Sequence, residues 1–351
     1  MVSRSKKMKS LTIHFLNVGH GDCTIIEFPD HLTMVDINNS RALDDETRQE
    51  LEAKIAKRNG LSHKLALWRS LGLGTPTEIA TELSKIEDKL TDPTDFFISR
   101  YGRQQSIFRY VQSHPDMDHM TGLYRLHEQE GIPIVNFWDN HHGVEKPSDV
   151  GPGGRFDMRD WDAYQKLRQS AESPKAVFYE RGLENEYYTG DGVRIWAPHR
   201  NRSGDDKSSD PNDLSYVLRI RFGACWILLG GDAPIQVWEK FYEEFKSLDE
   251  FGGQYPKIHL LKAPHHGRKS AYHWQSVKSM NPDVTIVSVG ELAAKDDACA
   301  SYETYSNAGC FSTRDHGNLT ALCWEDGDVW LYNQDGDRIV SSMEATNALA
   351  G

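Results

Sequence analysis

The chain has 351 residues, of which 38% are hydrophobic and 26% charged, an ordinary balance for a soluble globular enzyme of one or two domains. Its formal net charge of −12 disfavours a broad basic surface for nucleic acid, but not a nuclease, because a bound metal ion can anchor a phosphate by itself. No window approaches twenty consecutive apolar residues and the five cysteines include no CxxC pair, so we expect a cytoplasmic protein without signal peptide or membrane span.

The first part of the chain predicts a sheet interrupted by helices. Alternating apolar residues at 11–16, 23–28 and 32–37 predict three strands at hairpin spacing. Residues 41–90 carry Glu, Lys, Leu and Ala at helical spacing, which predicts a helical insertion. Such an insertion could cover a pocket as a lid, form a homodimer or dock a protein partner, and its pattern is compatible with all three. Residues 92–112 then predict a helix that leads into a strand.

The rest of the chain alternates strands and helices. We expect helices at 122–130 and 161–171, strands at 192–198, 215–223 and 224–232, and a helix at 234–245. A strand at 257–263, a helix after residue 271, a strand at 284–290 and a hairpin at 319–332 complete the pattern. This alternation of strands and helices in two successive halves of the chain predicts stacked sheets flanked by helices. We treat residues 1–351 as a single domain.

The stretch "VQSHPDMDHMTG" places four metal-capable side chains where a predicted strand ends: His114, Asp116, Asp118 and His119. Their spacing cannot lie on one helix face, so the side chains must converge from a loop. Imidazole suits zinc, manganese and iron, whereas carboxylates suit harder ions. The mixture therefore predicts a transition-metal or mixed divalent site.

Two distant segments repeat this arrangement of an apolar strand that ends in a ligand-type residue. "LLGGDAP" ends in Asp232, and "LLKAPHHG" ends in His265 or His266. A buried carboxylate is costly unless a metal ion or a base meets it. Taken alone, Asp232 could equally be a helix N-cap and the His-His-Gly stretch a polar turn.

The chain resembles the metallo-β-lactamase fold superfamily, and within it the hydrolase domain of ComEC-type DNA-uptake channels. The resemblance rests on "FLNVGHGDCTIIEF", "MVDIN", "SHPDMDHMTG", "NDLSYVLRIRFGACWILLGGDA", "LKAPHHGRKS" and "STRDHGNLT", which together span most of the chain. It implies an αββα sandwich that holds up to two metal ions where the sheets meet. It says little about the substrate.

The resemblance also implies a role for each matching residue. Site one would take His114 and Asp116, and site two would take Asp118, His119 and His265, with His266 as the alternative to His265. Asp232 would bridge both ions. Asp36 would orient a ligand histidine, although it could also be a turn-forming residue.

Two positions depart from the superfamily pattern. Asp116 stands where histidine is usual, and Asp213 stands where a further histidine is expected. A site of His114, Asp116 and Asp213 would be oxygen-rich, which favours manganese over zinc, and it could be weak or empty if Asp213 only caps a turn. His141 or His142 could instead supply the third ligand of site one. In total, we expect the chain to bind one or two divalent ions, Zn or Mn.

The predicted chemistry is hydrolysis by a metal-activated hydroxide, with Asp118 or Asp232 holding the attacking water. His316 is expected either to protonate the leaving group or to have a structural role. Arg268 and Lys269 are either phosphate contacts or solvated charges. We therefore expect a phosphodiesterase, above all a nuclease. Hydrolysis of an ester, lactone or thioester and partner binding with a structural metal are the alternatives.

Overall fold

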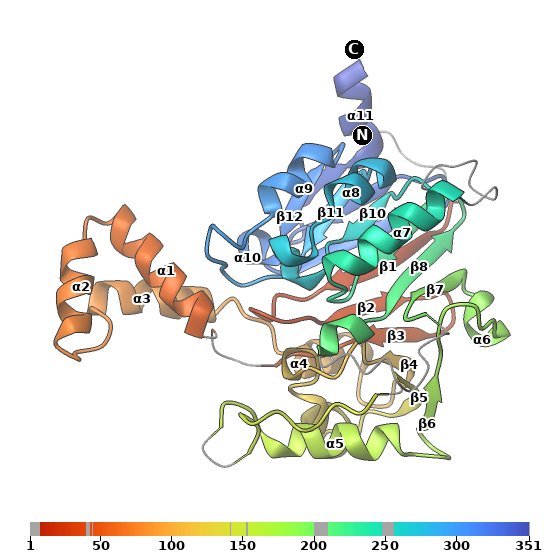
Figure 1. The fold of residues 1–351 in the computed structure, drawn as a ribbon, viewed down its shortest axis with the longest axis horizontal. Coiled ribbons are helices and arrows are strands. Elements are labelled where there is room, and N and C mark those ends of the chain that lie inside the picture. Colours follow the sequence, from red (N-terminus) through yellow and green to blue (C-terminus); the bar gives the residue numbers. More distant parts are fainter. Residues whose placement is uncertain are drawn as a thin grey trace.

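The computed structural model describes residues 8–39, 43, 45–140, 142–151, 154–199, 210–247 and 256–350. His141 lies outside these residues. The described strands form two sheets (Figure 1). The first has nine strands in the order β15 (Arg338–Ser341), β14 (Val329–Tyr332), β13 (Leu319–Trp324), β1 (Ser10–Phe15), β2 (Thr24–Glu27), β3 (Leu32–Val35), β4 (Ile107–Val111), β5 (Ile134–Asp139) and β6 (Lys175–Phe178).

The second described sheet has six strands. Their order is β12 (Gly309–Ser312), β11 (Val284–Val287), β10 (Leu260–Lys262), β9 (Cys225–Leu229), β8 (Val217–Phe222) and β7 (Val193–Ala197). The central core lies between the sheets, where Ile13 and Phe15 of β1 join one apolar cluster with Ile227 and Leu229 of β9. This shared core explains why β1 and β9 read as apolar in the sequence.

Helices cover both outer faces of the sandwich. Below the first sheet lie α4 (Pro93–Tyr101), α5 (Met158–Arg168) and the π-helix η2 (Tyr124–Gln129), which share a second apolar cluster with it. Against the second sheet pack α7 (Ile235–Ser247), α8 (Trp274–Met280) and α9 (Cys299–Tyr305), which form a third cluster. The predicted αββα sandwich is therefore confirmed.

Parallel strands in both sheets end at one edge of the sandwich. β3 pairs with β4 and β4 with β5 in parallel, as do β9 with β10, β10 with β11 and β11 with β12. The carboxyl ends of such strands lie side by side, which is where α/β proteins gather functional side chains. The turn between β1 and β2 and the 3-10 helices η1 (Met117–His119) and η5 (His265–Gly267) complete this edge.

The region predicted as a helical insertion contains α1 (Asp45–Arg58), α2 (Ser62–Ser70) and α3 (Thr77–Glu87), which extend from the body of the molecule (Figure 1). The insertion has an apolar core of its own that includes Leu51, Ile79 and Leu83. Its base is fixed to the second half of the chain, because the Thr47 hydroxyl accepts from the Glu291 backbone amide at 3.1 Å. Within the described residues, no helix is both long and apolar enough to cross a membrane.

Several short elements were not predicted from the sequence: β5, β6, β12, β15, α6 (Glu186–Thr189), α9, α10 (Thr313–His316) and α11 (Ser342–Ala350). Most strands among them are only partly buried, as are Gly309, Cys310 and Phe311 in β12. Such segments lack the regular alternation that identifies a strand. Their place is decided by pairing with a neighbour, as in β12 along β11.

A charged network at the end of β2 gives a prediction for acid stability. The Glu27 carboxylate accepts from Arg100 Nε and Tyr101 Oη, both at 2.7 Å, and lies 3.1 Å from His14 Nε2. Burial raises the pKa of Glu27, but these partners outweigh it and lower the pKa from 4.5 to about 2. Because the folded-state pKa is the lower one, the stabilisation is complete above pH 4.5 and disappears as the pH falls towards 2.

We therefore expect Glu27→Gln to lower the free energy of unfolding at pH 7, and the difference from the wild type to shrink as the pH falls from 4.5. Urea titrations at pH 7, 4 and 3 measure this. Glu184→Gln is the matched control, since the Glu184 side chain is 73% exposed and its ion pair with Arg194 is long, at 3.7 Å. A constant difference across the pH range would contradict the prediction.

Candidate metal centre

The first part of the centre is the turn that follows β4. The side-chain amide of Gln112 donates from Nε2 to the backbone carbonyls of His114 and His119, at 2.9 and 3.0 Å, and so holds both ends of the turn. Asp116 caps η1 by accepting from the Met117 amide at 2.9 Å. The turn thereby directs His114 and His119 into the junction between the sheets, where both side chains are buried.

Three buried imidazoles at this junction share one arrangement: Nδ1 is held and Nε2 is left without a hydrogen-bond partner. His119 Nδ1 donates to Asp36 at 2.8 Å, His266 Nδ1 donates to the Ser288 carbonyl at 3.0 Å, and His114 Nδ1 lies 3.0 Å from Ser113 Oγ. A hydrogen bond at one ring nitrogen fixes the orientation in which the other can bind a metal ion.

Two carboxylates face these imidazoles. One oxygen of Asp232 lies 3.3 Å from Nε2 of both His119 and His266, and its other oxygen, Oδ1, is buried without a hydrogen-bond partner. Asp118 lies 3.3 Å from His266 Nε2 and keeps 23% of its side chain exposed. Asp232 therefore lies between the two sheets, while Asp118 faces the solvent side of the cluster.

The electrostatics of the cluster are those of a cation site. Burial lowers the pKa of His119, but Asp232, Asp118 and Asp36 outweigh it and hold the pKa well above its ordinary value. Burial also lowers the pKa of His266, yet Asp232 and Asp118 raise it to about 10. For His114, burial and then His119 lower the pKa to about 3. Because the carboxylates raise the pKa of His119 and of His266, a metal ion at this position would compete with protons for these imidazoles.

A buried ion pair beneath the cluster was not predicted from the sequence. The Lys262 ammonium of β10 donates to Asp22, which follows β1, and both side chains are at most 4% exposed. Asp22 has a ligand atom within 4.8 Å of atoms on Asp36 and His119, and likewise on Asp232 and His266. The signal was present, since Asp22 ends the "NVGHGD" turn and Lys262 interrupts an apolar strand.

The backbone decides which of the two adjacent histidines points inward. Both residues have positive φ, 48° at His265 and 52° at His266, as does Asp36 at 59°. Such a conformation is costly for non-glycine residues and is concentrated at functional sites. The resulting turn buries His266, whereas His265 stays 23% exposed and 4.0 Å from Asp232. The structure thus places the alternative histidine, His266, in the centre of the cluster.

The oxygen-rich site expected from His114, Asp116 and Asp213 is not assembled among the described residues. Asp213 accepts from Gln236 Nε2 at 2.9 Å and belongs to none of the ligand groups. Asp116 also belongs to none of them, although it is close enough for Asp118 to add to burial in raising its pKa to about 6. The groups contain His114, His119 and Asp232, and separately His20, Asp118 and His266.

The other predicted residues lie around the cluster. Arg268 is half-buried, with Nη2 3.3 Å from His20 Nε2, whereas Lys269 is exposed and donates to the Ala294 carbonyl at 3.1 Å. His142 has both ring nitrogens engaged, by Tyr164 Oη at 2.6 Å and by the Val144 amide at 3.1 Å. It is therefore held away from a ligand role.

His316 lies in a different place from the metal-ligand groups. With Arg314 it lines a cavity of about 600 Å³ between the insertion and the carboxyl ends of β1 and β11. The Arg314 guanidinium is already paired with Glu291 at 3.1 Å and Asp297 at 3.5 Å. Gly19 and Val289 of this cavity are chain neighbours of His20 and Ser288, so its wall adjoins the cluster.

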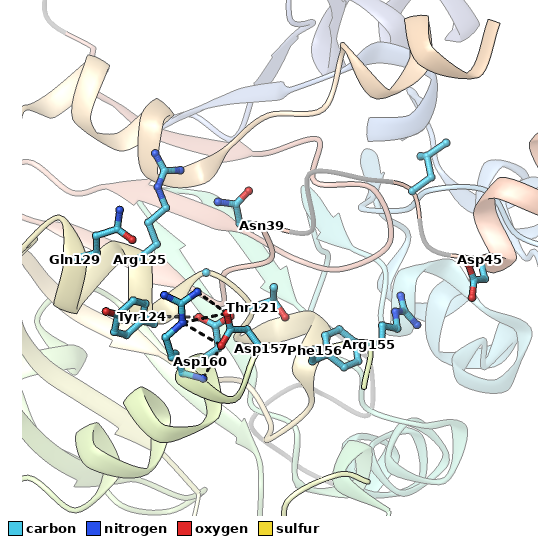
Figure 2. Close-up of a pocket in the computed structure, with 13 residues that line it drawn as sticks. Asn39, Asp45, Thr121, Tyr124, Arg125, Gln129, Arg155, Phe156, Asp157 and Asp160 are labelled. Carbon is cyan, nitrogen blue, oxygen red and sulfur yellow. Dashed lines mark hydrogen bonds and ion pairs between the residues drawn. The ribbon is translucent and has the colours of Figure 1, made fainter. Parts of the chain in front are cut away.

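A second cavity, of about 540 Å³, begins at Thr121 and Gly122, just after His119 (Figure 2). Arg125, Arg155 and Arg159 line it. Arg125 pairs with Asp95 at 2.6 Å and with Asp92, and Arg159 pairs with Asp157 at 2.6 Å. These pairs neutralise most of the positive charge, so this cavity does not have the character of an anion site.

The residues present fit one or two divalent ions. The candidate donors are imidazole nitrogens and carboxylate oxygens from several separate segments. Among them, Nε2 of His114, His119 and His266 and Oδ1 of Asp232 are buried without hydrogen-bond partners. Buried polar atoms without partners are rare unless an ion, water or substrate satisfies them. The arrangement can therefore hold metal ions with one side open to solvent through Asp118 and His265.

No protein family and no curated protein matched the sequence. Solved structures align over most of the chain at low identity. The metallo-β-lactamase fold protein YhfI from Bacillus subtilis is 9% identical, with a TM-score of 0.42 over 86% of this chain and 95% of that one. Igni18, a metallo hydrolase from Ignicoccus hospitalis, is 11% identical, with a TM-score of 0.43 over 88% and 98%.

A diphosphatase from the PhnP family is 10% identical, with a TM-score of 0.36 over 88% of this chain and 96% of that one. At TM-scores this low, such likenesses add no argument about activity. The fold class follows from the strand order of the chain itself, and the function has to be argued from its side chains.

Proposed function

We propose that the chain is a metal-dependent hydrolase and that its substrate is a phosphodiester, which includes nucleic acid. One observation carries this proposal: Nε2 of His114, His119 and His266 and Oδ1 of Asp232 are buried together without hydrogen-bond partners. A divalent ion bound to such donors lowers the pKa of water and neutralises charge that develops on a phosphoryl or carbonyl oxygen.

The protein residues around this position have distinct tasks. Asp36 holds His119, and the Ser288 carbonyl holds His266, so that both rings keep their Nε2 atoms aimed at Asp232. Asp232 is itself positioned by Ser215, whose hydroxyl accepts from the Asp232 amide at 3.1 Å. This support fixes the donors before substrate arrives, which is the condition for a preorganised site.

Asp118 is the residue best placed to contact water. It is partly exposed, and although burial raises its pKa, His119 and His266 hold that pKa well below its usual range. An ionised carboxylate at the solvent side of the cluster can accept a hydrogen bond from the attacking water and orient it. The same exposure argues against a purely structural metal, because structural sites are closed.

Hydrolysis of an ester, lactone or thioester is the second candidate. It is favoured by the pairing of Arg314 with Glu291 and Asp297, which leaves this guanidinium less available to a phosphate. A neutral substrate would need no such cation. A role for the insertion as lid, dimer contact or partner-docking element is compatible with either reaction.

The test is a substrate panel with metal-depleted protein and added Zn²⁺ or Mn²⁺. We expect hydrolysis of bis(p-nitrophenyl) phosphate and of single- or double-stranded DNA, with little action on p-nitrophenyl acetate or a thioester. Asp118→Asn should lower the rate by about 100-fold or more, as expected for loss of a positioned base. The control is Asp157→Asn, because Asp157 is the N-cap residue of α5 and belongs to none of the ligand groups of the described residues. Ester turnover without phosphodiester turnover would overturn the substrate assignment.

A further inference from the structure

His20 lies at the candidate metal centre. It belongs to the segment "FLNVGHGDCTIIEF", but it was not among the ligands expected from the sequence. It belongs to the turn between β1 and β2, in the first half of the chain. Its ring centroid is 4.5 Å from that of His266, which comes from the second sheet. A ligand atom of His20 lies within 4.8 Å of ligand atoms of both Asp118 and His266.

The turn that carries His20 is built to approach Asp118 closely. Gly21 has a φ of +141°, and a Cβ atom there would lie 2.6 Å from the Asp118 carbonyl and 2.3 Å from Asn38 Nδ2. Only glycine fits such a position. Asn38 then donates from Nδ2 to the His20 carbonyl at 2.7 Å. The position of His20 is therefore fixed from both sides rather than left to a free loop.

His20 presents a lone pair to a cation. Arg268 Nη2 lies 3.3 Å from His20 Nε2, and a guanidinium can only donate, so Nε2 is the acceptor in this contact. This ring nitrogen is therefore unprotonated, as a metal ligand must be, and an ion bound through it would displace the Arg268 donor. Beside it, Nε2 of His266 is buried without a hydrogen-bond partner and faces Asp118 at 3.3 Å.

We propose that His20 is a ligand of the divalent ion held by Asp118 and His266. This inference rests on the proposed metal-dependent function. The resulting donor set combines two imidazoles with carboxylate oxygen, and the neighbouring group of His114, His119 and Asp232 adds two further imidazoles. A centre this rich in nitrogen is softer than the oxygen-rich site expected from the sequence, and it favours zinc over manganese.

The experiment compares His20→Ala and His20→Gln with the wild type, with His63→Ala as the control because His63 is an exposed residue of α2. Metal-depleted proteins are titrated with Zn²⁺ against a chelating dye and loaded with Co²⁺ for visible spectra. Both His20 variants should bind the ion at least about tenfold more weakly, and their Co²⁺ spectra should change. Thermal melting of the metal-free proteins verifies folding, and His20→Gln serves if His20→Ala does not fold.

Unchanged Zn²⁺ affinity and an unchanged Co²⁺ spectrum in a folded His20 variant would overturn this inference while leaving the proposed hydrolase intact. Metal binding that depends on His20 in a protein without hydrolytic activity would support the inference and overturn the proposed function. A wild-type protein that binds neither ion would overturn both. Preference of the wild type for Mn²⁺ over Zn²⁺ would overturn the assignment of zinc.

Discussion

Replacing Asp232 by Asn is expected to remove most of the bound metal and to lower hydrolysis by roughly 10³-fold, equivalent to about 4 kcal/mol of transition-state stabilisation. Asp232 is 2% exposed and lies 3.3 Å from Nε2 of both His119 and His266, so it is the carboxylate shared by the ligands of the two sheets. Asparagine has nearly the same volume, which limits structural change. It removes the negative charge that a divalent ion requires.

The measurement combines metal analysis of purified protein with the phosphodiester assay. Asp213→Asn is the informative comparison, because the sequence pattern suggests Asp213 as a ligand whereas the structure pairs it with Gln236. We expect its metal content and rate to match the wild type. Retention of metal and activity by Asp232→Asn would contradict the proposed centre, and loss of metal from Asp213→Asn would restore the arrangement expected from the sequence.

Replacing Lys262 by Met is expected to destabilise the metal-free protein by about 3–5 kcal/mol, the usual cost of removing one partner of a buried ion pair. Lys262 and Asp22 are both almost fully buried and join β10 of one sheet to the β1–β2 turn of the other. Burial lowers the pKa of Lys262, but Asp22 outweighs it and raises the pKa above its ordinary value, so the ammonium is charged. Without this ammonium, the Asp22 carboxylate would lose its cationic partner while lying close to the carboxylates of Asp36 and Asp232.

Urea unfolding of metal-depleted Lys262→Met and of the Asp22→Asn/Lys262→Met double variant measures this effect. The double variant should recover much of the lost stability, because it carries no uncompensated buried charge. Equal stability of Lys262→Met and the wild type would show that the ion pair does not support the junction. Additive losses in the double variant would show that the two residues act independently.

The sequence located most of the candidate site because strand ends leave a readable pattern. Apolar runs before His114, Asp232 and His265–His266 predicted buried strands, and all three segments end at one edge of the sandwich. The family resemblance implied that Asp36 orients a histidine, and its carboxylate accepts from His119 Nδ1 at 2.8 Å. Parallel pairing then brings residues that are distant in the chain together.

Choices between neighbouring or equivalent side chains could not be made in this way. Positive φ at His265 and His266 turns the second ring inward, and this conformation is uncommon for non-glycine residues, so the sequence did not indicate it. Likewise, Asp213 has the offset of a ligand, but its Oδ1 accepts from Gln236 of α7 and it belongs to none of the ligand groups among the described residues.

The sequence pattern by itself indicated stacked sheets flanked by helices, helices within residues 41–90 and the segments that supply metal-capable side chains, because periodicity and local spacing are properties of the chain alone. The αββα class was implied by the family resemblance. Tertiary structure decided which donors meet: His266 over His265, Asp22 with Lys262, and His20 beside Asp118. These contacts join two different sheets across a buried junction. Their distances depend on how the sheets pack and on charges that only burial makes strong, so no single segment could reveal them.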